Sequence, residues 1–310
     1  MVEDYPLIAV AGPTASGKTA LALALAEALN GEIVSCDSVS VYRLMEIGTA
    51  KPSLEERARV PHHCLDLYWP DEACTAGDWA RHARAAIADI RSRGRLPIIA
   101  GGTGLYLRAL LDGLAPAPLR DEALRNRLRY RAEAHGGPYL HRLLLRLDPT
   151  AAAAIHANDV PKLIRSLEVT LAARTPQTEQ WKAGREPLTG YKILRLGLAP
   201  DRDELYSRIN LRAASMFDRG LVLETGMLRD RYGEACRPLT SLGYAQAMHL
   251  LRHEISFPEA VAAAQQGHRN YAKRQLTWFR REPDTHWLAG FGDEPEIQSK
   301  AITLAQTALQ

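Results

Sequence analysis

Cysteine is scarce in this sequence: there are four among 310 residues, and no two of them form a CxxC pair. The stretch "HHC" (62–64), followed by Cys74, does not have the ligand spacing of a common zinc site. Cys36, Cys64, Cys74 and Cys236 show no regular spacing either. These absences exclude the standard zinc modules, and we expect reduced thiols with a structural role.

Long hydrophobic runs are absent as well. No unbroken apolar run reaches the roughly 18 residues that a membrane-spanning helix needs. The first residues, "MVEDYPLIAVAG", lack the charged, apolar and small-residue parts of a secretory signal. We therefore expect a protein of the cytoplasm with no membrane association.

A strong excess of either charge is missing too, because 39 basic and 36 acidic residues give a net charge of +3. The distribution is uneven. Seven arginines and three acids lie between Arg120 and Arg146, and five basic and two acidic residues lie between Arg269 and Asp284. Such clusters can bind a polyanion, although they are also typical of a solvated helix face.

Strands and helices alternate in the first part of the chain. "PLIAVAG", "EIVSCD" and "LPIIAGG" each have the short apolar run of a buried strand. The pattern predicts a helix from about 18 to 30 after the first strand, with Gly31 as a left-handed stop. The amphipathic segment "TAGDWARHARAAIADIRSRG" predicts a second helix before the third strand. This alternation indicates an α/β fold with a parallel sheet, in which ligands bind beyond the carboxyl ends of the strands.

The alternation stops at Pro116 and Pro118, and the pattern from about 121 to 183 is helical and rich in Arg, Leu and Ala. "GYKILRLGLAP" returns to a strand, and the next helix has Leu205, Ile209 and Met216 on one face. Further helices are predicted through "NYAKRQLTWFRRE", and "THWLAG" is a candidate last strand. We therefore predict a core domain of residues 1–115 and 188–310, interrupted by an all-helical insertion of residues 116–187.

One motif carries specific chemistry. "GPTASGKT" (12–19) fits the pattern G-x-x-x-x-G-K-[ST] between a predicted strand and a predicted helix, which is the context of a P-loop. Glycines let backbone amides turn toward an anion, and the helix N-terminus adds its dipole. Lys18 would span two phosphoryl groups, and the Thr19 hydroxyl would hold Mg²⁺. The motif predicts a bound di- or triphosphate and leaves its identity open.

A nucleotide kinase normally has further parts that this sequence lacks. A conventional Walker B aspartate would follow another apolar strand, but "LPIIA" is followed by "GGTG". The carboxylate that does follow a strand in this region is Asp37, which could act as a general base, contact a metal through water or cap a helix. A kinase of a small metabolite, with Asp37 as the base, is the first alternative that the residues leave open.

Six segments together resemble one known family. They are "GPTASGKT", "DSVSVYRLMEIGTAKP" (37–52), "GGTGLYLRALLDGL" (101–114), "GLVLETGML" (220–228), "SLGY" (241–244) and "AKRQLTWFRR" (272–281). In this order and at this spacing they resemble the tRNA dimethylallyltransferases, from about residue 7 to 281. The resemblance implies a P-loop NTPase-like core with a tRNA-binding helical insertion. It also implies dimethylallyl diphosphate as donor, the anticodon stem-loop of a tRNA as acceptor, and Mg²⁺ as cofactor.

The resemblance implies roles for individual residues. Asp37 would be the general base for the adenine amine, and Thr103 would hydrogen-bond at the reacting centre. Arg212 would stabilise the leaving pyrophosphate, with Arg208 one helical turn earlier as its rival. The diphosphate itself would lie on Gly12, Pro13, Thr14, Ala15, Ser16, Gly17, Lys18 and Thr19.

The acceptor adenine has to leave its stack to react, and RNA loops are read through unstacked bases while phosphates supply affinity. The resemblance assigns RNA contacts to four groups of residues. The groups are Asp37, Ser38, Val39, Ser40 and Thr103; Arg125 with Pro161, Lys162, Leu163, Ile164 and Arg165; Gly243 and Tyr244; and Lys273, Arg274, Gln275, Leu276, Thr277, Trp278, Phe279 and Arg280. From composition alone, Trp278 and Phe279 fit the protein core equally well.

The sequence departs from the family pattern at three places. Ser40, Pro161–Lys162 and Ala245 stand where Gln, Gln-Arg and a basic residue are common. These departures concern RNA contacts and leave the phosphate loop, Asp37 and Thr103 intact. Prenyl transfer to free adenine nucleotides would leave the arginine-rich insertion unexplained, and an RNA-binding protein without catalysis would not need Lys18 and Asp37. No apolar heptad is visible, so we expect a monomer.

Overall fold

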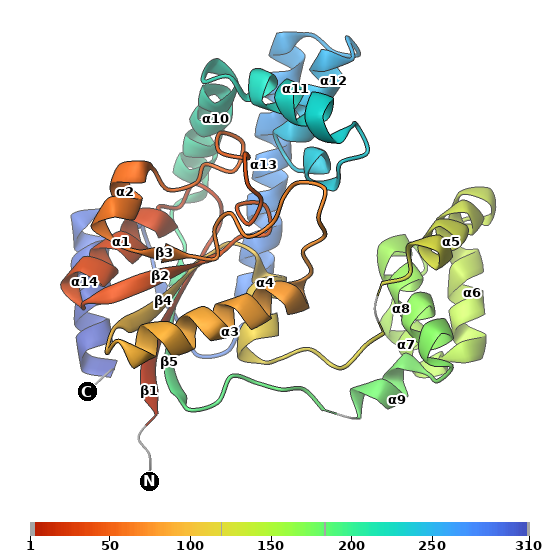
Figure 1. Ribbon diagram of the computed structural model, residues 1–310, viewed down its shortest axis with the longest axis horizontal. Helices are drawn as coiled ribbons and strands as arrows, with labels where there is room; N and C mark the ends of the chain where they lie inside the picture. Colours follow the sequence, from red (N-terminus) through yellow and green to blue (C-terminus); the bar gives the residue numbers. More distant parts are fainter. Residues whose placement is uncertain (1–3, 119, 183, 309–310) are drawn as a thin grey trace. The chain divides into compact units, whose positions relative to one another are not determined.

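The computed structural model describes residues 4–118, 120–182 and 184–308. The chain forms two compact units (Figure 1). The core unit consists of Met1–Leu111 and Leu188–Gln310, and the helical unit is Asp112–Pro187. Each has hydrophobic clusters of its own. In the part of the chain that the structure describes, none of the helices combines the length and hydropathy needed to cross a membrane.

Six parallel strands form one sheet within the described residues of the core unit, in the order β3-β2-β4-β1-β5-β6. They are β1 (Tyr5–Ala11), β2 (Gly31–Cys36), β3 (His62–His63), β4 (Leu96–Gly101), β5 (Tyr191–Leu198) and β6 (Thr285–Leu288). The predicted parallel α/β fold is confirmed, including the last strand from "THWLAG". The sequence pattern did not indicate β3, because two residues are too few to show a period.

Alternate residues of the central strand face two different layers of helices. Leu7 and Ala9 belong to a cluster with α3 (Ala76–Ser92), α4 (Gly104–Leu111) and α13 (Phe257–Phe279). Ile8 and Val10 pack with α1 (Lys18–Ala28) and α14 (Pro295–Ala308), which lie together at the sheet in Figure 1. Because both faces of the sheet are covered, its strands have continuous apolar runs instead of alternating ones.

The remaining elements of the core unit are helical. They are α2 (Leu54–Arg59), α10 (Arg202–Asp218), α11 (Leu221–Tyr232), a 3₁₀ turn η1 (Arg237–Thr240) and α12 (Tyr244–Leu251). The expected left-handed stop at Gly31 was wrong. Asn30 has a φ of 53°, and Gly31 is the first residue of β2. Asparagine also tolerates this conformation, so it ends the turn after α1.

The helical unit contains α5 (Glu122–His135), α6 (Gly137–Leu147), α7 (Pro149–Ala154), α8 (Val160–Ala173) and α9 (Gln177–Trp181). Prolines stand in the first turns of α6, α7 and α8, where a missing N–H costs nothing. The core of the unit is made of leucines and small residues, among them Leu128, Leu140 and Leu163. As the sequence predicts, no strand occurs in its described residues.

Candidate active site

Three loops with predicted site residues meet at one edge of the sheet. Ala11 and Cys36 are both in register with Gly101, so β1, β2 and β4 end level with one another. The phosphate loop (12–17), Asp37 and the second glycine loop (102–103) follow these three strand ends directly. The parallel sheet thereby brings together motifs that are far apart in the sequence.

The phosphate loop has the backbone geometry of an anion site. Gly17 has a φ of 84° and stands at the N-terminus of α1. A Cβ at this position would lie 2.7 Å from the backbone nitrogen of Gly292, whose N–H donates to the Ser16 carbonyl over 2.9 Å. The buried hydroxyl of Ser16 has no hydrogen-bond partner among the described residues. The loop therefore requires glycine and offers an unused buried hydroxyl to a ligand.

This loop lines a pocket of about 470 Å³, a volume ordinary for a small-molecule site. Thr14, Ala15, Gly17, Lys18 and Thr19 contribute from the phosphate loop and the start of α1. The opposite sides are contributed by Ser35, Asp37, Ser40, Gly102, Arg212, Tyr271 and Gln275. Six of the nine predicted diphosphate residues therefore share one pocket with the predicted base, and Gly12, Pro13 and Ser16 do not line it.

Lys18 and Arg212 concentrate positive charge in the pocket. The Lys18 ammonium donates to the Pro13 carbonyl over 2.6 Å. Burial, and next the positive charge of Arg212, lower the pKa of Lys18 to about 7. Burial also lowers the pKa of Arg212. Two partly buried cations that repel one another favour the binding of an anion beside them.

We expect the affinity for a diphosphate to fall as the pH rises above about 7. The free protein loses the Lys18 proton near its pKa of about 7, whereas a bound anion favours the charged amine, so binding takes up a proton. The dissociation constant should rise by up to about tenfold per pH unit until the pKa of the complex is reached. Calorimetry at about pH 8 in two buffers of different ionisation enthalpy measures this uptake.

The Lys18→Arg variant is the control, because arginine stays charged throughout this range. It should show no proton uptake and a flat affinity. The absence of uptake in the wild-type protein would contradict the assignment of this titration to Lys18.

The two rival arginines differ in their partners. Arg208 donates to both carboxylate oxygens of Asp293, at 2.7 and 2.8 Å, and lies 3.6 Å from the ring centre of Phe291. The positive charge of Arg212 contributes to the lowered pKa of Lys18, and the charge of Asp37 acts to raise the pKa of Arg212 against the effect of burial. Both arginines line the pocket, but Arg208 is already paired with Asp293, which favours Arg212 as the cation that faces a ligand.

The carboxylate of Asp37 is oriented by its own loop. One oxygen, Oδ1, accepts hydrogen bonds from the backbone amides of Val39 at 2.8 Å and Ser40 at 3.0 Å. The other oxygen has no hydrogen-bond partner within the described ranges. The Ser38 amide donates to the Thr103 hydroxyl over 3.1 Å, which ties this loop to the second glycine loop. Asp37 is thus fixed in direction and keeps one oxygen for a ligand.

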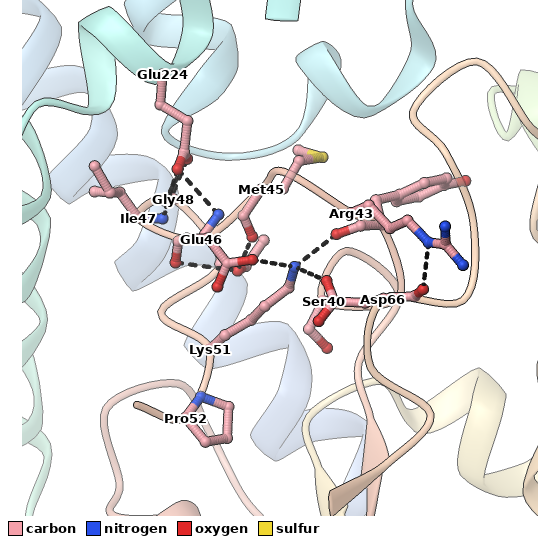
Figure 2. Close-up of polar contacts among 12 residues, drawn as sticks. Ser40, Arg43, Met45, Glu46, Ile47, Gly48, Lys51, Pro52, Asp66 and Glu224 are labelled. Atoms are coloured by element: carbon pink, nitrogen blue, oxygen red, sulfur yellow. Dashed lines mark hydrogen bonds and ion pairs between the residues drawn. The ribbon is translucent and has the colours of Figure 1, made fainter. Parts of the chain in front are cut away.

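The rest of this loop, residues 41–52, is fixed by two charged groups (Figure 2). The buried carboxylate of Glu224 on α11 accepts from the amides of Glu46 and Ile47, each at 3.0 Å, and from that of Gly48 at 3.2 Å. The Lys51 ammonium, 1% exposed, donates to the Tyr42 carbonyl and pairs with Glu46 and Asp66 at 3.0 and 2.6 Å. These contacts hold the segment that carries Asp37 and Ser40.

Helix α13 has two faces of different character. Lys273, Arg274, Thr277 and Arg280 are exposed. Gln275 is buried and Tyr271, one turn earlier, is half-buried, and both line the pocket. Burial, and next the charge of Asp37, raise the pKa of Tyr271 to about 12, against a hydrogen bond with Thr103 that lowers it. The helix thus presents basic side chains outward and neutral polar side chains to the pocket.

Several side chains expected to contact RNA are buried instead. Tyr244 is fully buried, and its hydroxyl donates to Glu224 over 2.6 Å. Phe279 is 2% exposed in the main core cluster. In the helical unit, Leu163 and Ile164 are 0% and 7% exposed in the leucine core. These four side chains support the fold, because their helices turn them inward.

The charged members of the predicted RNA set in the helical unit have protein partners. Arg125 and Arg165 both pair with Oε2 of Glu168, at 2.8 and 2.6 Å, and the Glu168 side chain is 0% exposed. Burial raises the pKa of Glu168, but hydrogen bonds from the two arginines and the Asp121 amide outweigh it and lower that pKa. Lys162 is exposed and pairs with Asp159.

Sequence reasoning missed four residues of this region: Lys51, Glu224, His268 and Tyr271. His268 and Arg212 line the same small cavity. Burial, and next the positive charge of Arg212, lower the pKa of His268 to about 4. Lys51 and Glu224 lie in motifs that the sequence does single out, "IGTAKP" and "GLVLETGML". A signal for Tyr271 is its spacing of four residues from Gln275, which places both on one helix face.

The fold and the pocket define a P-loop α/β protein whose phosphate loop shares a pocket with a carboxylate. Comparison with known proteins makes this specific. Residues 40–282 match the family model described as IPP transferase, so the chain belongs to that family. A tRNA dimethylallyltransferase of Koribacter versatilis is 59% identical to this chain, over 99% of this chain and 100% of its own.

Solved structures agree with this assignment. The chain resembles the crystal structure of a full-length tRNA isopentenylpyrophosphate transferase from Bacillus halodurans, with a TM-score of 0.73, 37% identity and coverage of 98% and 96% of the two chains. It also resembles a eukaryotic dimethylallyltransferase acting on tRNA, with a TM-score of 0.79 and 25% identity, over 98% of this chain and 77% of that one.

Proposed function

We propose that this chain transfers a dimethylallyl group from dimethylallyl diphosphate to the exocyclic amine of the adenine on the 3′ side of the anticodon, in tRNAs that read codons beginning with U. The reaction releases pyrophosphate. The observation that carries this proposal is the shared pocket: a phosphate loop and two partly buried cations line it together with a carboxylate that has one unused oxygen. The names of the relatives supply the donor and the acceptor.

The reaction needs a base because an amine conjugated with its ring is a poor nucleophile. As the amine nitrogen forms its bond to the allylic carbon, the bond from that carbon to the diphosphate oxygen breaks. Asp37 accepts the amine proton through the oxygen that the loop amides leave unused. The electron pair of the broken bond leaves with pyrophosphate.

The leaving pyrophosphate gains negative charge, and the cations of the pocket stabilise it. Lys18 and Arg212 supply the two positive charges, and the amides of the phosphate loop and the N-terminus of α1 add their dipoles. The Thr103 hydroxyl accepts a hydrogen bond from the amide of Ser38, the neighbour of Asp37, which supports a role for Thr103 near the reacting atoms. The pocket holds the reactants in line, which lowers the entropic part of the barrier.

Mg²⁺ fits this site through the Thr19 hydroxyl, which lines the pocket at the start of α1. Within the described residues, no group of three or more His, Cys, Asp or Glu side chains could hold a metal ion. Magnesium characteristically binds through few protein ligands together with substrate phosphates and water. When bound, it would neutralise charge on the diphosphate.

The RNA-binding role rests on exposed basic residues. These are Lys273 and Arg274 on α13, which also carries pocket residues, and Arg280 directly after the helix. In the helical unit, Lys162 is exposed, and Arg165 is partly exposed. We propose that both surfaces bind phosphates of the anticodon stem-loop, while the adenine leaves its stack and enters the pocket. The monomeric state and the cytoplasmic location stay predictions.

Mass spectrometry of an unmodified anticodon stem-loop tests the proposal. The RNA is incubated with the protein, Mg²⁺ and dimethylallyl diphosphate, and with ATP in place of the donor in a parallel reaction. We expect the gain of one five-carbon unit at the adenine beside the anticodon, without a requirement for ATP. If a related active enzyme modifies the RNA and this protein does not, while it consumes ATP on a small acceptor, a kinase function replaces the proposal.

A further inference from the structure

Gln275 is buried at the contact between two loops of the active site. Its side-chain oxygen accepts from the backbone amide of Thr14 in the phosphate loop over 2.8 Å. Its side-chain nitrogen donates to the carbonyl of Gly102 in the second glycine loop over 2.9 Å. The side chain is 6% exposed, so both ends of the amide are used inside the protein.

The two hydrogen bonds fix the distance between groups that act on the same substrate. Thr14 lies in the phosphate loop. Gly102 immediately precedes Thr103, whose hydroxyl accepts a hydrogen bond from the Ser38 amide in the loop of Asp37. A Cβ on Gly102 would lie 2.1 Å from the Gln275 nitrogen, so the amide fits closely against this loop. Only a group with an acceptor at one end and a donor at the other satisfies both backbone partners.

From these contacts we infer that Gln275 is a positioning residue, which sets the spacing of the diphosphate cradle and the loop of Thr103. This differs from a direct contact with RNA, the role that the sequence motif suggests for this position. The basic residues around Gln275 on α13 point outward, whereas Gln275 joins the helix to the two loops. The expected changes in kcat and KM rest on the proposed function, whereas the expected change in diphosphate affinity does not.

Two substitutions separate the possible roles. The Gln275→Glu variant keeps the shape and the acceptor for the Thr14 amide, but places an acceptor against the Gly102 carbonyl. The Gln275→Leu variant adds no charge and leaves both backbone groups unpaired. Gln265→Glu is the matched control: Gln265 lies on the same helix and its side-chain nitrogen donates to the Asn210 carbonyl over 3.1 Å, away from both loops.

The measurements are the melting temperature, the dissociation constant for dimethylallyl diphosphate by calorimetry, and kcat and KM with the stem-loop. We expect both Gln275 variants to raise the dissociation constant for the diphosphate by about tenfold and to lower kcat by about tenfold, because the backbone donors lose alignment. The KM for RNA and the values of the Gln265→Glu control should stay close to wild type.

Other outcomes overturn the inference. A raised KM for RNA with unchanged diphosphate affinity in the Gln275→Leu variant would assign Gln275 to RNA contact. A lowered melting temperature with unchanged binding and kinetics would assign it to stability alone. The dissociation constant for the diphosphate is measured without RNA, so it does not depend on whether the wild-type protein modifies the stem-loop. A failure of the proposed function is therefore recognised separately.

Discussion

Replacement of Asp37 by asparagine is expected to lower kcat by about 10²- to 10⁴-fold, with nearly unchanged KM values for the diphosphate and the RNA. The asparagine side chain would keep an oxygen for the amides of Val39 and Ser40, so the loop retains its hydrogen bonds. What the substitution removes is the carboxylate that accepts the amine proton. Single-turnover kinetics with the stem-loop measure the chemical step directly.

Asp201→Asn is the matched control for this variant. Oδ1 of Asp201 likewise accepts from two backbone amides, those of Asp203 and Glu204, at 2.9 and 3.1 Å. Asp201 is the N-cap residue of α10 and is not among the residues that line the pocket. The control should retain wild-type kcat. If Asp37→Asn also retained it to within about threefold, Asp37 would not be the base.

The second large effect is expected for Lys18→Gln. This variant loses the charge that stabilises the leaving pyrophosphate, and kcat/KM for dimethylallyl diphosphate should fall by about 10²- to 10³-fold. The affinity for the stem-loop should remain, since the exposed basic face of α13 is unchanged. Initial rates over a range of diphosphate concentrations, and filter binding of labelled RNA, measure the two quantities.

Lys300→Gln tests whether loss of any lysine has this effect, because Lys300 is exposed on α14. It should behave as wild type. Equal losses of diphosphate turnover and RNA affinity in Lys18→Gln would indicate a damaged fold, and a kcat/KM within about threefold of wild type would contradict the assigned role.

The central part of the site could be predicted from the sequence because its signals are local. The P-loop pattern, an apolar run before it and a helix after it all lie within a short segment, and each follows from backbone geometry. Asp37 could be placed in the same pocket because parallel strands bring their carboxyl ends to one edge. Five of the six strands follow from the alternation of short apolar runs and helices, whereas β3 does not, because its two residues show no period.

Burial of the helical residues could not be predicted in the same way. Phe279 lies in a motif rich in basic residues, and Tyr244 ends the short motif "SLGY". Only the packing of α12 and α13 against the core decides that the two rings are inside. The contact of Glu224 with the amides of residues 46–48 joins segments that no sequence period connects. Gln275 illustrates the same point, since a helix motif gives no information on what each side chain reaches.

The ion pairs of the helical unit also determine how RNA binding should respond to salt. Counterion release counts only the cations that phosphates newly neutralise. Arg120 and Arg129 already pair with Glu122, and Arg125 pairs with Glu168. The effective charge that this unit offers to an RNA backbone is therefore smaller than the seven arginines between Arg120 and Arg146 suggest. The slope of RNA affinity against ionic strength therefore measures the positive charge that these internal ion pairs leave available to phosphates.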